Sequence, residues 1–296
     1  MKRKLKVQQD IRKRKQYKYM SSSAAIATLN ELRKRPLIKQ RTPEWFKLRE
    51  NRLTASDLYD AIKNPLSLAK KKLKGMTFNS SAIPALKWGC MYEPMATRIY
   101  SMMNNKEVFE FGLIINDDIK HFGASPDGIT EDGVMIEIKC PFSRKIIDGD
   151  IPEKYYYQIQ GQLAVCNLND CDYIECEFIE FSSYEEYLTN VKELDDKNES
   201  YKHGIIAEFK VKSEYEYKYS TNNQTANINL TEMNEYISQN YKLIYWKLKL
   251  INIQKVIFDK DKWKNEITDK IENFNKIYMK EKELSKPINL FIDDDN

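Results

Sequence analysis

The sequence contains no run of about 18 apolar residues, so we expect no transmembrane helix. Its N-terminus is basic but lacks the apolar stretch of a secretory signal peptide. Cysteine is scarce, and the five cysteines are an odd number without the spacing of a disulfide framework. Reduced thiols are therefore expected, and the chain is predicted to work inside the cell, in a cytosolic or nuclear compartment, and not to be secreted.

The residues that are present are typical of a globular protein, with 42% hydrophobic and 31% charged residues and only nine glycines. A chain of 296 residues is long enough to bury a sizeable core as one large domain or two small ones. The sequence shows no internal repeat.

Positive charge is concentrated at one end of the chain. Residues 1–41 hold 14 Lys or Arg against two acidic residues, whereas the whole chain has a net charge of only +4. Such a block repels itself and is predicted to be a disordered tail. It would add salt-dependent affinity for nucleic acid, act as a nuclear-import signal, or be a solvated tail without a specific role. Residues 284–296 are predicted to be a second, acidic tail.

The remaining body, residues 42–283, alternates helical and strand patterns, which predicts an α/β domain with a central mixed sheet flanked by helices. Helices are expected from Thr42, from Leu53 and over 86–103, 153–166 and 263–283, the last with an apolar stripe. Strands are expected over 108–115 and 172–181, and a hairpin over 121–140. The pattern of residues 241–258 fits a strand or a helix, and a strand is favoured. Two segments are expected to be largely irregular, namely a lysine-rich loop at 65–84 and an insert at 184–227 that contains a short helix.

The predicted hairpin carries the most informative polar residues. In its second strand Ile136 and Ile138 point to one face, while Glu137 and Lys139 point to the other. Asp127 precedes the loop and approaches the same place. Two converging carboxylates are suitable oxygen ligands for a divalent cation, and a neighbouring lysine can orient a water. The alternative at this point is a surface hairpin whose charged residues only face solvent.

Three further polar positions near the hairpin also fit a core poorly. Glu93 lies beside an apolar helix stripe, and Pro94 next to it suggests that Glu93 begins a helix. Asp117 lies in a turn pattern, where it has an ordinary role. Gln158 shares one helix face with Tyr155 and Gln162, which is either a solvated face or the wall of a polar cleft. Together the four carboxylates and Lys139 suit one or two Mg²⁺ ions acting on a phosphodiester.

A phosphate site is predicted near the start of the body. Ser56 lies at an expected helix N-terminus, with Arg49 and Arg52 close by in the sequence. Simple helix capping is the alternative for Ser56.

These stretches resemble, in order, the YqaJ-type viral recombinase and phage lambda exonuclease family of the PD-(D/E)xK nuclease superfamily. Pro126-Asp127 followed by Glu137-Ile-Lys139 resembles the superfamily signature. The further matching stretches begin at Trp45, Gly89, Ala124 and Tyr155, and the resemblance covers about residues 41–165. It implies a restriction-endonuclease-like core.

The resemblance also implies roles for individual residues. Asp127, Glu137 and the carbonyl of Ile138 would be metal ligands, with Glu93 beside the metal and Lys139 activating the attacking water. Asp117 resembles a further acidic position of the family.

Arg49 and Ser56 match residues that hold a terminal 5′-phosphate, and Gln158 matches a residue that places the water or the scissile phosphate. Tyr155 and Arg52 complete the expected substrate contacts.

The function implied is an Mg²⁺-dependent nuclease, also accepting Mn²⁺, that digests double-stranded DNA ends 5′→3′ in viral or phage-type recombination. A single-strand annealing protein and a homo-oligomer are family possibilities, and no membrane is involved. The alternatives are an endonuclease on the same scaffold, a CRISPR-adaptation-type nuclease, and a DNA-binding module without catalysis. The adaptation type usually carries a four-cysteine iron–sulfur cluster, a pattern that the cysteines here do not fit.

Overall fold

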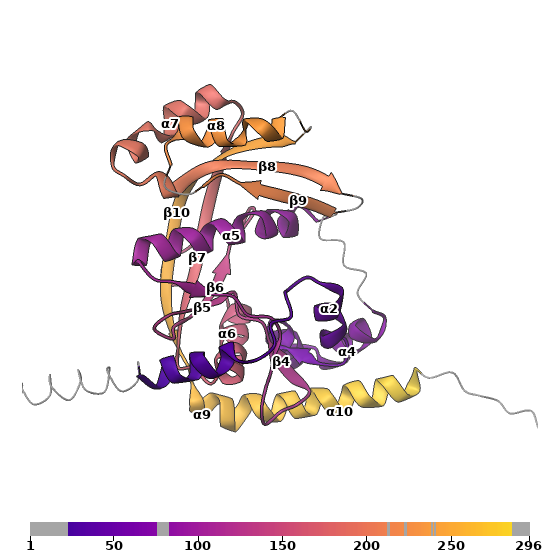
Figure 1. Ribbon diagram of the computed structural model, residues 1–296. Helices are drawn as coiled ribbons and strands as arrows, with labels where there is room; N and C mark the ends of the chain where they lie inside the picture. Colours follow the sequence, from indigo (N-terminus) through magenta and orange to yellow (C-terminus); the bar gives the residue numbers. More distant parts are fainter. Residues whose placement is uncertain are drawn as a thin grey trace, which may run out of the picture.

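A seven-stranded mixed sheet forms the centre of the protein (Figure 1). The computed structural model describes residues 23–75, 83–211, 214–221, 224–237, 239 and 241–285. The strands, in spatial order, are β2 (Val108–Phe109), β5 (Gly128–Thr130), β6 (Met135–Lys139), β7 (Asp170–Phe181), β10 (Lys242–Ile257), β8 (His203–Val211) and β9 (Glu214–Tyr219). Strands β6 and β7 are parallel, and the other pairs are antiparallel. The predicted α/β class with a mixed sheet is confirmed.

Helices cover both faces of this sheet, which is why its central strands are buried on both sides. Helix α5 (Pro84–Asn104) packs against Ile136 and Ile138 of β6 on one face. Helix α6 (Glu153–Cys166) and helix α10 (Thr268–Leu284) pack with Met135 on the other face. The predicted alternation of β6 is therefore correct.

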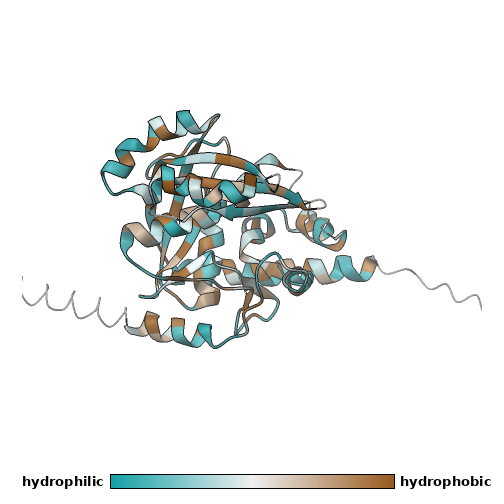
Figure 2. Cartoon of the chain, turned by 45° about the horizontal axis from the view of Figure 1, so that its top comes forward, coloured by the Kyte–Doolittle hydropathy of each residue, from teal (hydrophilic) through white to brown (hydrophobic). Residues whose placement is uncertain are grey.

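The long C-terminal helix packs through the apolar stripe expected from the sequence. Ile267, Ile271, Phe274 and Tyr278 are all buried against the core that contains α6. Hydrophobic and hydrophilic residues alternate along α10 in Figure 2, as expected for an amphipathic helix that buries one apolar face.

A smaller, three-stranded sheet lies beside the main one and changes two predictions. It consists of β1 (Leu53–Thr54), β4 (Phe122–Ala124) and β3 (Ile114–Ile115). The single strand predicted over 108–115 is therefore two short strands in different sheets. Gly112 lies between them, packed so closely that an added Cβ would lie 2.0 Å from the carbonyl oxygen of Ile38. The hairpin itself consists of β5 and β6, and β4 belongs to the smaller sheet.

The start of the body also differs from the prediction. Helix α2 (Pro43–Arg49) begins at the Thr42 cap as expected. The second helix, expected from Leu53, is instead strand β1, a 3₁₀ turn and α3 (Leu58–Lys63). Residues 23–33 are helical and bury Leu29 and Leu32 in the core, so the folded body begins well before residue 42. Residues 1–22 of the predicted basic tail and residues 286–296 of the acidic tail lie outside the described residues.

Both segments expected to be largely irregular contain regular structure. The lysine-rich segment forms α4 (Pro65–Leu73) before the residues that are not described. The insert contains α7 (Tyr184–Asp196), strands β8 and β9, and the start of α8 (Ala226–Ile237). These helices lie over β8 and β10 with their own apolar cluster, at the top of Figure 1. No helix in the described part of the chain is long and apolar enough to cross a membrane.

Candidate active site

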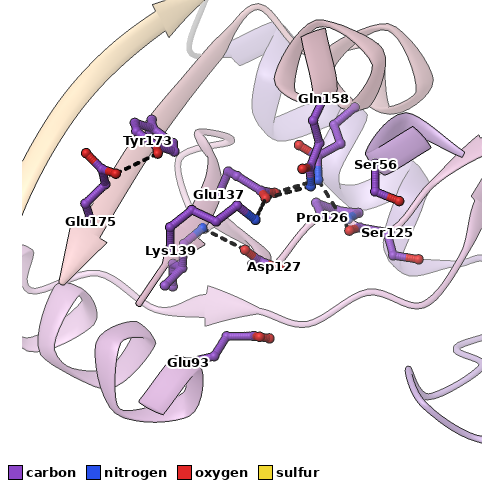
Figure 3. Close-up of polar contacts among 12 residues, drawn as sticks. Ser56, Glu93, Ser125, Pro126, Asp127, Glu137, Lys139, Gln158, Tyr173 and Glu175 are labelled. Atoms are coloured by element: carbon purple, nitrogen blue, oxygen red, sulfur yellow. Dashed lines mark hydrogen bonds and ion pairs between the residues drawn. The ribbon is translucent and has the colours of Figure 1, made fainter. Parts of the chain in front are cut away.

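The antiparallel pairing of β5 and β6 brings Asp127 opposite Glu137. Gly128 pairs with Ile136, so the residues next to them, Asp127 and Glu137, face each other across the two strands. The amide of Ile138 donates a hydrogen bond of 2.6 Å to Oδ2 of Asp127. The carboxylates of Asp127 and Glu137, which are ten positions apart in the chain, therefore converge at one point (Figure 3).

Glu137 is fully buried and held by three donors. The amide Nε2 of Gln158 lies 2.6 Å from Oε1, and that of Gln162 lies 2.7 Å from Oε2. The ammonium of Lys139 also contacts Oε1 (Figure 3). Because both amides come from α6, this helix orients the carboxylate from above the sheet. Gln162 was indicated only as part of a polar helix face, and the sequence contains no signal that it bonds Glu137.

The electrostatics of the pair favour a cation. Burial raises the pKa of Asp127 well above its usual range, and the charges of Glu137 and Glu93 raise it further. The charge of Lys139 and the hydrogen bond from the Ile138 amide lower this pKa but do not offset the increase. Burial lowers the pKa of Lys139, but Glu137 and Asp127 outweigh this and raise it overall. Two buried carboxylates therefore share one ammonium, so that their negative charge is only partly compensated.

The donor set fits a hard divalent ion such as Mg²⁺. Asp127 and Glu137 provide carboxylate oxygens, and Ile138, the predicted backbone ligand, lies next to Glu137 on β6. Within the described residues no cluster of three or more His, Cys, Asp or Glu side chains could hold a metal alone. The protein would thus supply only part of the coordination, as is usual for Mg²⁺, which keeps waters and takes substrate phosphate oxygens.

Glu93 lies near this pair but has a different partner. It is in the middle of α5, not at a helix start, because the helix continues through Pro94. Its Oε2 accepts a hydrogen bond of 2.8 Å from the guanidinium of Arg41, whose own φ is 66°. Figure 3 shows Glu93 on its helix, apart from the hydrogen-bonded group around Glu137.

The expected position of Asp117 needs correction. Asp117 follows β3 in the turn that leads to β4, at the end of this hairpin opposite to Asp127. Its carboxylate is 73% exposed and pairs with Arg35 at 2.8 Å. The hairpin geometry thus keeps it away from the carboxylate pair, and we leave it out of the metal site.

The carboxylate pair lies in a cleft of about 1090 Å³. Lys139, Gln158 and Gln162 line it together with Asp127 and Glu137. Further basic side chains line the same cleft, namely Arg41, Arg49, Lys71, Lys72, Lys87 and Lys282. A basic cleft with a carboxylate pair inside it suits a phosphodiester substrate.

Arg49 and Ser56 come together in this cleft, as predicted. Nη2 of Arg49 lies 3.2 Å from Oγ of Ser56 and 3.2 Å from Oγ1 of Thr54. The guanidinium also lies 4.2 Å from the centroid of the Trp45 ring. Burial lowers the pKa of Arg49, although Asp57 partly opposes this. The guanidinium is therefore held in place by neutral groups, which leaves its charge available to an anion.

Two expected substrate contacts do not line the cleft. Arg52 donates a hydrogen bond of 2.7 Å to the carbonyl of Leu48 and faces a separate small pocket. The ring centroid of Tyr155 lies 5.0 Å from Nζ of Lys139, which itself lines the cleft. The structure thus separates Arg52 from Arg49 and makes Tyr155 a neighbour of the lysine.

A buried carboxylate beside Lys139 had no signal in the sequence. Glu175 of β7 is opposite Lys139 in the β6–β7 register and is fully buried. It accepts a hydrogen bond of 2.8 Å from Tyr173 (Figure 3). It also pairs with Arg144. This group supports the strand that carries Lys139.

Comparison with known proteins agrees with the resemblance found in the sequence. Residues 44–169 match the family model described as a YqaJ-like viral recombinase domain. An uncharacterized protein of Acanthamoeba polyphaga mimivirus is 30% identical over 294 residues, which covers 81% of this chain and 52% of that protein. The chain therefore spans about half the length of this curated relative.

The solved structures that match this chain include two exonucleases. An alkaline exonuclease from Laribacter hongkongensis, LHK-Exo, matches with a TM-score of 0.49 and 22% identity, covering 82% of this chain and 95% of that one. Its complex with dAMP gives the same TM-score and coverage at 21% identity. A phage-related exonuclease from Haemophilus somnus 129PT matches with a TM-score of 0.43 and 11% identity, covering 79% and 96%.

Proposed function

From the premise that residues 44–169 are a YqaJ-like viral recombinase domain, we propose that the protein is a divalent-metal-dependent nuclease that digests double-stranded DNA from its ends. One observation carries the proposal: Asp127, Glu137 and Lys139 converge inside a basic cleft. Mg²⁺ is the proposed ion and Mn²⁺ an accepted substitute, since both take oxygen ligands.

In this proposal Asp127, Glu137 and the Ile138 carbonyl hold the metal, with Glu93 close by. A bound divalent ion supplies charge that offsets the developing negative charge on the phosphate and lowers the pKa of a water ligand. Lys139, kept protonated by the two carboxylates, donates a hydrogen bond that positions the attacking water. Gln158 and Gln162 fix the orientation of Glu137, so that the carboxylate does not have to reorganise during the reaction.

The proposed direction of digestion is supported by the second part of the cleft. Arg49 and Ser56 would hold the terminal 5′-phosphate of one strand by charge-assisted hydrogen bonds. A strand anchored by its 5′ end presents its first phosphodiester bonds to the carboxylate pair, which makes 5′→3′ digestion the proposed polarity.

The test is digestion of linear duplex DNA in Mg²⁺ by the wild type and by Asp127→Asn. We expect complete digestion by the wild type, no digestion in EDTA, and a loss of at least about a thousandfold in Asp127→Asn. Asp117→Asn is the matched control, because its carboxylate pairs with Arg35 outside the cleft, and it should retain activity.

Closed circular duplex separates the proposal from its alternatives. An end-dependent enzyme leaves circular DNA intact, whereas an endonuclease on the same scaffold cuts both forms. Binding of DNA without hydrolysis of either form would support a binding module instead and overturn the proposal.

A further inference from the structure

The wall of the cleft that faces Arg49 is aromatic. Tyr215 and Tyr217 of β9 line the cleft together with Lys87 from the first turn of α5. In Figure 1, β9 and the adjoining end of α5 lie above α2 and α4, which carry Arg49 and the lysines of the other wall. Strand β9 lies outside residues 44–169, so the two tyrosines of this wall lie outside the segment that matches the family model, whereas Lys87 lies inside it.

The strand pattern of β9 directs three tyrosines to the same face. Tyr215, Tyr217 and Tyr219 alternate with residues of the other face, as residues two apart in a strand do. Tyr219 anchors the row, because its hydroxyl donates a hydrogen bond of 3.0 Å to the carbonyl of Met91 in α5. The rings of Tyr217 and Tyr219 are 6.4 Å apart. Tyr215 and Tyr217 are half-buried and reach the cleft.

Lys87 fixes this row against α5. Its ammonium lies 2.7 Å from Oε2 of Glu208, a buried carboxylate opposite Tyr217 on β8. The same ammonium lies 3.6 Å from the ring centroid of Tyr215. The ring is therefore held in position before any ligand binds, which lowers the entropy cost of stacking a base on it.

The two walls suit different parts of a nucleic acid. Arg49, Lys71 and Lys72 on one wall suit phosphate oxygens, whereas tyrosine rings on the other suit the faces of unpaired bases. We propose that Tyr215 and Tyr217 form a stacking platform for unpaired bases of the DNA strand that is not hydrolysed. This inference rests on the proposed function, because 5′→3′ digestion leaves that strand as a 3′ single-stranded overhang at the entrance of the cleft.

The experiment measures binding in EDTA, so that no hydrolysis occurs and the result does not depend on catalysis. The probes are a blunt 5′-phosphorylated duplex and the same duplex with a 3′ overhang that carries 2-aminopurine. Base–aromatic stacking is worth about tenfold in affinity for each base. We expect Tyr217→Leu to weaken binding of the overhang duplex about tenfold and to leave binding of the blunt duplex within about twofold.

The conservative variant Tyr217→Phe separates stacking from a structural role. It keeps the ring and should retain both the affinity and the quenching of 2-aminopurine fluorescence, whereas Tyr217→Leu should lose the quenching. Tyr215→Leu is the second variant, with thermal unfolding measured for each to identify any that fails to fold. Equal weakening on blunt and overhang duplexes, or unchanged quenching in both folded leucine variants, would overturn the proposal. Failure of the wild type to digest duplex DNA in Mg²⁺ would instead contradict the proposed nuclease.

Discussion

The guanidinium of Arg41 lies 2.8 Å from the carboxylate of Glu93, and both charges act on Asp127 at the proposed metal site. The pair keeps Glu93 engaged with an arginine in the absence of metal. Because the side chains are 49% and 32% exposed, the strength of the pair is limited by solvent screening. If Glu93 contributes to the proposed metal site, Arg41 and a divalent cation would therefore compete for the same carboxylate.

Removing Arg41 is expected to strengthen metal binding. In Arg41→Gln the carboxylate of Glu93 becomes available and one positive charge leaves the cleft, so Mn²⁺ should bind about threefold more tightly by isothermal titration. The double variant with Glu93→Gln separates the two causes. If the gain persists in full without the Glu93 carboxylate, competition for Glu93 is not its source.

Replacing Gln162 by Leu is expected to reduce turnover and metal affinity by about tenfold or more. The variant removes the hydrogen bond that Gln162 donates to Oε2 of the buried Glu137. The carboxylate of Glu137 then loses part of what fixes its orientation. Metal affinity and the rate of duplex digestion are both measured. Unchanged metal affinity in a folded Gln162→Leu protein would refute a positioning role.

Arg49→Ala should reduce the digestion of 5′-phosphorylated ends by about tenfold more than that of 5′-hydroxyl ends, because only the former present the extra anion. The measurement is the ratio of initial rates on the two substrates. Arg52→Ala is the matched control, since Arg52 bonds the Leu48 carbonyl outside the cleft and should leave this ratio unchanged. Equal losses on both ends in Arg49→Ala would remove the phosphate pocket from the proposal.

The protein should become less stable as the pH is lowered, because of His203. Burial lowers the pKa of His203, although the neighbouring Asp195 partly opposes this. Below the ordinary histidine pKa of about 6.5 the unfolded chain therefore binds more protons than the folded one. The free energy of unfolding should then decrease as the pH falls through about 6.5, with the loss continuing at lower pH.

Urea unfolding at several pH values, for wild type and His203→Gln, measures this dependence. The variant should lose less stability than the wild type between pH of about 7.5 and 5.5. An identical pH dependence in the two proteins would contradict the assignment to His203.

The sequence was most informative where a pattern is local. The period of α10, the cap at Thr42 and the bounds of α6 depend on neighbouring residues, and all three were predicted correctly. The convergence of Asp127 and Glu137 was also predictable, because a short hairpin determines which residues face each other.

Features that depend on distant pairing were not predictable. The split at Gly112 depends on a close contact with Ile38, and the partner of Asp117 is an arginine 82 residues away. Strand β8 of the insert pairs with β10, which follows it in the chain, and β9 pairs with β8. No local signal distinguishes such strands from an irregular polar segment.

The matched domain ends at residue 169, one position before β7 begins, although β7 pairs with the strand that carries Glu137 and Lys139. A protein truncated there would leave β6 as an open sheet edge with its buried apolar residues uncovered, a template for aggregation. The recombinase-like segment is therefore not a detachable module in this chain. Residues 170–285 must therefore have folded before Asp127, Glu137 and Lys139 are held in their observed arrangement, which would couple the proposed activity to folding of the segment that follows the matched domain.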